Sequence, residues 1–164
     1  LKAYISDSTV EIFEKMKVLT KKELKARYDI RLENYIKKIQ IESRMIGDLA
    51  QNHVVSTAVK YQTRLVQTSK SLLEMELKDE AEPIIQIIKD ISRHVKIISL
   101  KVGEMTDARR KANNIESVEE RARLYSTEVK SFFDIIRKEV DKLELIIDDE
   151  DWPLTKYREL LFIR

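Results

Sequence analysis

The stretch TKKELKARYDIRLENYIKKIQIESRMIGDLAQNHVVSTAVKYQTRLVQTSKSLLEMEL, residues 20–77, decides the fold of this chain. It contains a single glycine, Gly47, and no proline, so no residue in it is expected to end a helix. Its apolar residues recur at steps of three or four residues, or their sums, with one irregular step after Leu49, and this spacing predicts a helix rather than a strand. The predicted apolar stripe consists of Leu24, Tyr28, Leu32, Tyr35, Ile39, Ile46, Leu49, Ala58, Tyr61, Leu65, Leu72 and Met75.

The start of this long helix is also predicted by its sequence. Thr20 and Glu23 form a capping box, in which the hydroxyl and the carboxylate each accept a hydrogen bond from a free backbone N–H group. At about 1.5 Å per residue the segment would be roughly 85 Å long if it were straight. Since this length exceeds the width of a domain of this size, the helix is expected to bend or to extend beyond its partners.

A short helix and a helical hairpin are expected to pack on the long helix. Ser8 and Glu11 form a second capping-box pattern, which predicts a short helix at about residues 9–17. Pro83 marks the next boundary, because proline fits the first turn of a helix and disfavours helix at the residue before it. The predicted hairpin, at about residues 84–147, consists of helices at Ile84–Lys111 and Ser117–Ile147. Ser117 and Glu120 form a third capping-box pattern at the start of the second helix, whose apolar residues keep a nearly strict 3.5-residue spacing.

The hairpin is about half as long as the long helix, so it is expected to cover only part of it. The short connection at Pro83 favours the C-terminal half, from about Leu49 to Met75. The N-terminal half of the long helix then lacks cover, and its apolar residues become a candidate interface with another part of a larger protein or with a neighbouring subunit. These residues are Leu24, Tyr28, Leu32, Tyr35 and Ile39.

The residues after the hairpin, 148–164, are predicted to form a docked tail. The acidic run Asp148–Asp151 opposes the helix dipole and should end the last helix. The residues that follow are too apolar for a free tail, so they are expected to pack back onto the helices. The side chains predicted to be buried by this docking are Trp152, Tyr157, Leu161 and Phe162.

The composition agrees with an all-α fold, an elongated antiparallel helical bundle that forms one helical domain over residues 1–164. Only two glycines and two prolines occur, as expected where tight turns are few. The 31 basic and 29 acidic side chains nearly balance, and this gives no indication of nucleic-acid binding. No membrane span or signal peptide is predicted, so a cytoplasmic location is expected. The chain begins at Leu1 without a methionine, and we expect it to be part of a larger protein.

The residues of this chain do not form a recognisable catalytic or metal-binding motif. The absence of cysteine excludes disulfides, thiolate metal sites and cysteine nucleophiles. A di-metal centre in a helical bundle needs Glu-x-x-His pairs, but the residues three positions before His53 and His94 are Ala50 and Ile91. Both histidines are therefore expected to be partly exposed or hydrogen-bonded helix residues. No glycine-rich phosphate loop is found. We therefore predict that this chain contains no catalytic, cofactor-binding or metal-binding residue.

Several stretches resemble the C-terminal helical region of type III glutamine synthetases. The similarity is found in Glu23-Leu24-Lys25-Ala26-Arg27-Tyr28, followed by Leu32-Glu33-Asn34-Tyr35 and Ile41-Glu42, and again from Arg137 through Asp141 to Leu143-Glu144. The most specific match is Trp152-Pro153-Leu154-Thr155-Lys156-Tyr157-Arg158-Glu159-Leu160-Leu161-Phe162-Ile163, which is similar to the closing signature of that family.

The resemblance implies a parent enzyme that joins ammonia to glutamate with ATP and Mg or Mn, in large homo-oligomeric rings. It also implies that the catalytic residues lie outside this chain, whose partners would be the catalytic domain and neighbouring subunits, with no nucleic acid and no membrane. The chain would then have a structural or assembly role. The alternative is a stand-alone helical adaptor or coiled-coil interaction module, which the periodicity fits equally well.

Overall fold

A computed structural model describes residues 2–156, 159 and 161, and the part of the chain that it describes is helical, with no strand. The all-α prediction is therefore confirmed. In chain order the elements are η1 (Lys2–Ile5), α1 (Asp7–Lys15), α2 (Lys21–Asp48), η2 (Leu49–Val55), α3 (Ser56–Glu74), α4 (Lys78–Asn113), α5 (Val118–Leu124), η3 (Tyr125–Val129) and α6 (Ser131–Ile146).

The predicted long helix is present, as α2, η2 and α3 without interruption. The capping box at its start is complete, because Thr20 N donates to Glu23 Oε2 at 2.7 Å and Glu23 N donates to Thr20 Oγ1 at 3.3 Å. The segment η2 is a π-helix and begins at Leu49, where the apolar spacing becomes irregular. A π-helical turn takes more residues than an α-helical one, so it changes which face the following residues occupy.

The long helix ends in a Schellman motif, in which Leu77 N donates to the carbonyl oxygen of Leu72 at 2.9 Å. Glu76 occupies the left-handed position of this motif, with φ 63°, where glycine is usual. The boundary predicted at Pro83 is therefore wrong, since the turn lies before Lys78 and Pro83 lies inside α4. Pro83 leaves the carbonyl of Asp79 without its helical donor, which is tolerated because Asp79 is exposed.

The remaining predicted helices are found with small changes at their ends. The N-cap of α1 is Ser6 and not the predicted Ser8, because the side chain of Ser6 accepts a hydrogen bond from Thr9 N. Ser117 caps α5 as predicted. The second arm of the hairpin contains another π-helical segment, η3, between α5 and α6, which the nearly regular apolar spacing of that arm did not indicate.

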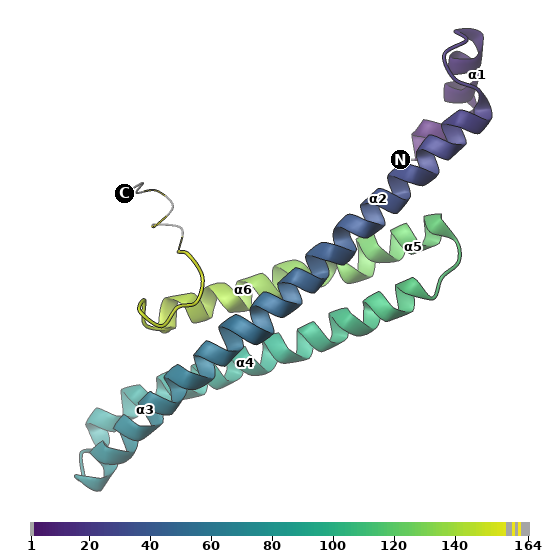
Figure 1. Cartoon of the computed structure of the whole chain (residues 1–164). Helices are drawn as coiled ribbons and strands as arrows, with labels where there is room; N and C mark the ends of the chain where they lie inside the picture. Colours follow the sequence, from purple (N-terminus) through teal and green to yellow (C-terminus); the bar gives the residue numbers. More distant parts are fainter. Residues whose placement is uncertain (1, 157–158, 160, 162–164) are drawn as a thin grey trace.

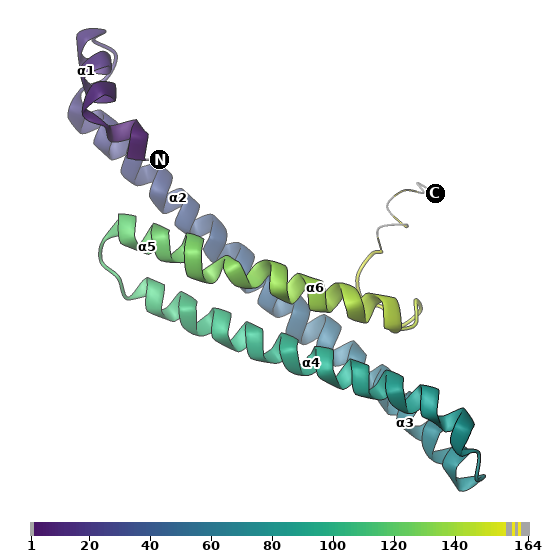
Figure 2. The ribbon, with the colours of Figure 1, turned by 180° about the vertical axis from the view of Figure 1, so that it is seen from behind.

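The hairpin of α4 and α5–α6 crosses the long helix, so the number of helices packed together changes along the molecule (Figure 1). At one end α3 and α4 run side by side as a two-helix arm. In the middle, α4 and α6 both lie against the long helix, as the view from behind also shows (Figure 2). At the other end, α1 and the start of α2 project beyond the hairpin.

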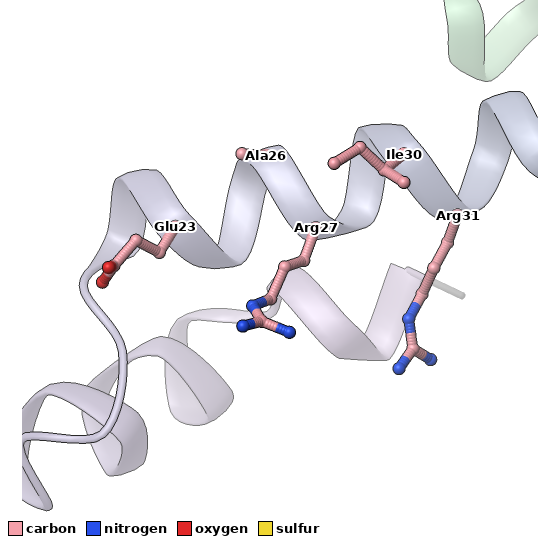
Figure 3. Close-up of a pocket in the computed structure, with 5 residues that line it drawn as sticks. All are labelled: Glu23, Ala26, Arg27, Ile30 and Arg31. Carbon is pink, nitrogen blue, oxygen red and sulfur yellow. The ribbon is translucent and has the colours of Figure 1, made fainter.

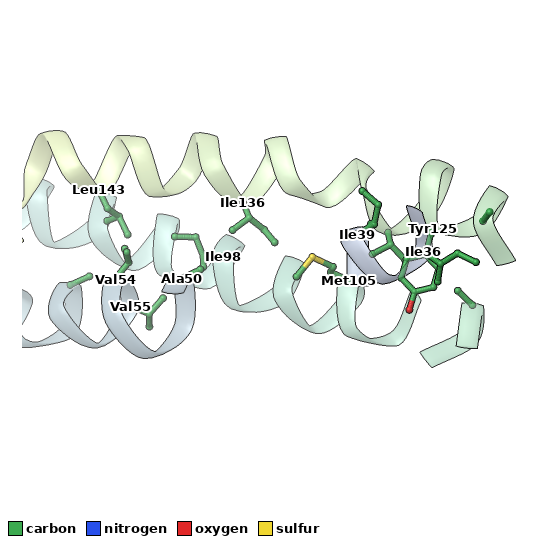
Figure 4. Packing of buried hydrophobic residues seen from close by; sticks show 14 of the residues in the cluster. Ile36, Ile39, Ala50, Val54, Val55, Ile98, Met105, Tyr125, Ile136 and Leu143 are labelled. Atoms are coloured by element: carbon green, nitrogen blue, oxygen red, sulfur yellow. The ribbon is translucent and has the colours of Figure 1, made fainter. Parts of the chain in front are cut away.

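In the middle of the molecule, buried side chains from the long helix, α4 and α6 pack together as the core (Figure 4). Ile98 and Met105 of α4 are fully buried there, as are Val54 of η2 and Leu143 of α6. The two-helix arm is held differently, with the small residues Ala58, Ser69 and Ala81 buried along it.

Candidate interaction surfaces

The residues predicted to form an uncovered interface on α2 are in fact covered by the chain itself. Leu24 is 0% exposed, Tyr28 2%, Leu32 5% and Ile39 3%, and Tyr35 is half-buried. The prediction that this half of the long helix lacks cover is therefore wrong.

The hairpin covers these residues because it is longer than the sequence indicated. Helix α4 has 36 residues, which at about 1.5 Å per residue is roughly 54 Å, and α5 continues the cover toward the start of α2. Glu119, at the start of α5, lies 3.7 Å from Lys25 Nζ. Burial, with the nearby Glu119 carboxylate, raises the pKa of the Tyr28 hydroxyl. Tyr4 and Ile5 of η1 add further cover.

The prediction that the tail docks on the helices is confirmed only for the first part of the tail. Trp152 is buried, at 9% exposed, and Leu154 packs against the core. Lys156 Nζ donates to the carbonyl oxygen of Glu144 at 3.2 Å, which fastens this part of the tail to the end of α6. Leu161 is 66% exposed, so the prediction that it is buried is wrong: the packing described for the tail ends at Lys156. Tyr157 and Phe162 lie outside the described residues.

One buried polar contact joins α4 and α6 and was not predicted as a pair. His94 Nδ1 donates to Glu139 Oε2 at 2.6 Å, and Lys142 Nζ donates to the other carboxylate oxygen at 2.6 Å. Burial opposes ionisation of Glu139, but the hydrogen bonds from Lys142 and His94 hold the pKa of its carboxyl below the usual value of 4.5. The periodicity places both residues inside their helices, but it could not show that they meet. The contact is structural, since it is closed off from solvent.

The exposed face of α2 is basic and partly apolar. Helix α2 carries eight basic and five acidic side chains. Its surface recess is lined by Glu23, Ala26, Arg27, Ile30 and Arg31, and the two arginines extend from it in the same direction (Figure 3). Arg31 lies over the ring of Tyr4, at 4.8 Å from its centroid. Glu23 lines the same recess, and the pKa of its carboxyl is lowered by the hydrogen bonds from Thr20 and, to a smaller extent, by the positive charge of Arg27.

The tip of the two-helix arm has the opposite charge. Residues 74–82 carry five acidic side chains and one basic side chain. Among these, Glu74 lies 3.8 Å from Lys70. Met75 and Leu77, on either side of Glu76, are 59% and 38% exposed. The tip is therefore acidic with exposed apolar side chains, the complement of the α2 surface.

The residues that the structure describes include two histidines, His53 and His94, and no cysteine. Among them, no group of three or more His, Cys, Asp or Glu side chains could hold a metal ion. In the same part of the chain, no helix is both long enough and apolar enough to cross a membrane.

Comparison with known proteins identifies the family. The family described as "Glutamine synthetase C-terminal domain" matches residues 1–73. A glutamine synthetase of Bacteroides fragilis is 43% identical over 152 residues, which cover 90% of this chain and 21% of that protein. The chain belongs to the C-terminal region of the glutamine synthetase family. This confirms the resemblance found in the sequence.

Two further relatives match nearly the whole chain. A glutamine synthetase of Butyrivibrio fibrisolvens is 27% identical over 97% of this chain and 23% of its own length. A type-3 glutamine synthetase of Dictyostelium discoideum is 26% identical over 97% of this chain and 22% of its own length. The chain therefore spans about a fifth of the length of the curated glutamine synthetases that it matches.

Proposed function

We propose that this chain is a non-catalytic helical part of a larger glutamine synthetase, an ATP-dependent enzyme that joins ammonia to glutamate. The observation that carries the proposal is the match at 43% identity over 90% of this chain but only 21% of the relative. The ATP and the Mg or Mn of the parent enzyme would be bound outside this region. We also expect the parent enzyme to be cytoplasmic.

The role that we propose for this region is to brace the catalytic part of the same chain and to provide surface for assembly into a homo-oligomer. A long helix held by a crossing hairpin is suited to that role, because it places charged surfaces at both ends of a stiff rod. The family match favours this function over a stand-alone adaptor.

The absence of chemistry in this region is tested by titrating the chain with ATP in the presence of Mg or Mn in a calorimeter. We expect no saturable heat, because its sequence contains no phosphate-binding loop. The control is the full-length protein, which should bind ATP under the same conditions. A saturable, metal-dependent isotherm for the isolated chain would contradict the proposal.

A further inference from the structure

Polar side chains from three elements meet where α2, α4 and η3 come together. Arg109 of α4 donates from Nη1 to Ser43 Oγ of α2 at 3.3 Å, and Ser43 is fully buried. Tyr125, the first residue of η3, is fully buried in the core shown in Figure 4. Its hydroxyl donates to Asn113 Oδ1 of α4 at 2.7 Å. Arg109 and Asn113 are one helical turn apart, so the two hydrogen bonds lie on the same side of α4.

Positive charge accumulates at this junction. Burial, together with the positive charges of Arg44 and Arg110, lowers the pKa of the Arg109 guanidinium. Burial raises the pKa of the Tyr125 hydroxyl. The charges of Arg109, Arg44 and Arg121 all act in the opposite direction on that pKa, which places the three guanidinium groups near the hydroxyl. We call these three residues the arginine cluster.

The described part of the chain does not neutralise Arg44 and Arg109. Arg110, which follows the cluster residue on α4, forms an ion pair with Asp107 of the same helix at 3.2 Å. Among the residues that the structure describes, neither Arg44 nor Arg109 is within ion-pair distance of a carboxylate, and no carboxylate contributes to the pKa shift of Arg109. The two guanidinium groups therefore face like charge.

This arrangement is unfavourable for the chain on its own. Arg109 is half-buried, and burial removes water from a charge that a nearby like charge then repels. The hydrogen bond to Ser43 is to a neutral group, so it supplies no opposite charge. It occupies one donor of the Arg109 guanidinium and leaves its other N–H groups open. An anion between Arg44 and Arg109 would compensate both charges.

The chemistry of the junction favours a carboxylate as this anion. Arg121 is already used, because its Nε and Nη2 donate to the carbonyl oxygen of Ile115 at 2.9 and 2.7 Å. Arg44 and Arg109 remain, and two guanidinium groups from separate helices suit the two oxygens of a carboxylate. Phosphate sites often use free backbone N–H groups at a helix N-terminus. Arg44 and Arg109 lie inside α2 and α4, where the helix uses those groups.

We propose that Arg44 and Arg109 bind the carboxylate of an aspartate or glutamate side chain that lies in the parent protein outside residues 1–164. The inference rests on the proposed function, because the chain spans about a fifth of the length of its curated relatives and the rest of the parent supplies the carboxylate. The arginine cluster is then a point at which the helical region is fastened to another part of the same chain or to a neighbouring subunit.

Zero-length cross-linking of the full-length protein tests the proposal. A carbodiimide joins a lysine amine to a carboxylate in contact with it, whereas arginine does not react. Arg44→Lys and Arg109→Lys should each give a cross-link to an aspartate or glutamate outside residues 1–164, which peptide mass spectrometry identifies. The matched control is Arg110→Lys, which should cross-link to Asp107 in its own helix. The proposal is overturned if the control cross-links while positions 44 and 109 do not, or do so only within residues 1–164.

Arg44→Gln should have opposite effects on the isolated chain and on the full-length protein. In the isolated chain it removes the repulsion with Arg109, so the melting temperature should rise by roughly 1–2 °C. In the full-length protein it removes a partner of the carboxylate, so the melting temperature should fall. Arg137→Gln, at an exposed position of α6, is the control and should change neither value appreciably. A change of the same sign in both proteins would contradict the proposal.

Titration of the isolated chain with inorganic phosphate, in the absence of metal, distinguishes a free anion from a protein side chain. We expect no saturable rise in melting temperature below about 1 mM phosphate. A saturable rise that Arg109→Gln abolishes would show that the site takes a free anion and would overturn the proposal.

The proposed function and this inference fail separately. A saturable, metal-dependent ATP isotherm for the isolated chain overturns the proposed function and leaves the cross-link from position 44 unaffected. A full-length protein that makes glutamine but gives no cross-link from positions 44 and 109 overturns the inference alone.

Discussion

The middle of the molecule and its two-helix arm are built from the same helices but are held together in different ways. In the middle, large side chains such as Ile98, Ile136 and Leu143 are at most 1% exposed, between three helices. In the arm, the small residues Ala58, Ser69 and Ala81 are buried together with the larger Ile91, and the apolar side chains of Val59, Val66 and Leu73 remain on the surface. The middle therefore fixes the fold, while the arm extends a surface. Proteins open locally where buried apolar contacts are few, so the arm should also be the less protected region.

Truncation of a core side chain should have the largest effect. Ile98→Ala should lower the free energy of unfolding by about 2–5 kcal/mol, because it leaves a cavity between three helices. Val66→Ala, at a residue of the arm that is 46% exposed, should change it by less than about 0.5 kcal/mol. Urea denaturation of both variants measures the difference. Similar losses of unfolding free energy in the two variants would show that the middle and the arm do not differ in the way that they are held together.

The polar contact between α4 and α6 should have an intermediate effect that depends on pH. Glu139→Gln should lower the free energy of unfolding at pH 7 by about 1–3 kcal/mol, because hydrogen bonds from a cation are weakened at a buried site. The control is Glu74→Gln in the arm, whose exposed contact with Lys70 should be worth at most about 0.5 kcal/mol.

The sign of the pH dependence follows from the direction of the pKa shift. The pKa of Glu139 is lowered by folding, so its contribution is complete above the ordinary value of 4.5 and is lost as the pH falls through the folded pKa. Urea denaturation of the parent chain should show this loss below pH 4.5, and the Gln variant should show less of it. If the free energy of unfolding fell equally in the two chains as the pH was lowered, the contact would have no role in the pH dependence.

The smallest effect is expected at a hydrogen bond inside the arm. Gln62 Nε2 donates to the carbonyl oxygen of Ile88 at 3.0 Å and to Ser92 Oγ at 2.5 Å, which ties α3 to α4. Gln62→Ala should cost about 1 kcal/mol and should speed amide hydrogen exchange in α3 without changing exchange in the middle. Gln67→Ala, at an exposed position of the same helix, is the control. Equal acceleration in both regions would show that the arm and the middle open together.

Local signals in the sequence were sufficient to predict the helices. The pairing of Thr20 with Glu23 and the cap at Ser117 depend only on neighbouring residues, and both were predicted correctly. The irregular apolar step after Leu49 marked the first π-helical segment, although its meaning was not clear from the spacing alone. The turn at Glu76 was missed because it uses a glutamate where glycine is the usual signal.

Contacts between distant parts of the chain could not be predicted in the same way. The cover of Tyr28 and Leu32 depends on where α4 begins, and starting that helix at Pro83 instead of Lys78 made the hairpin too short. The pair of His94 and Glu139 depends on how α4 and α6 are aligned, which periodicity does not fix. The docking of the tail was predicted from its apolar character, and that character did not distinguish the buried Trp152 from the exposed Leu161.

The proposed role in assembly is tested most directly by measuring the mass of the full-length protein with and without this region. Mass photometry should show a large homo-oligomer for the intact protein and smaller species after the region is removed, with circular dichroism confirming that the remaining chain is folded. An assembly of unchanged subunit number after removal would contradict the account.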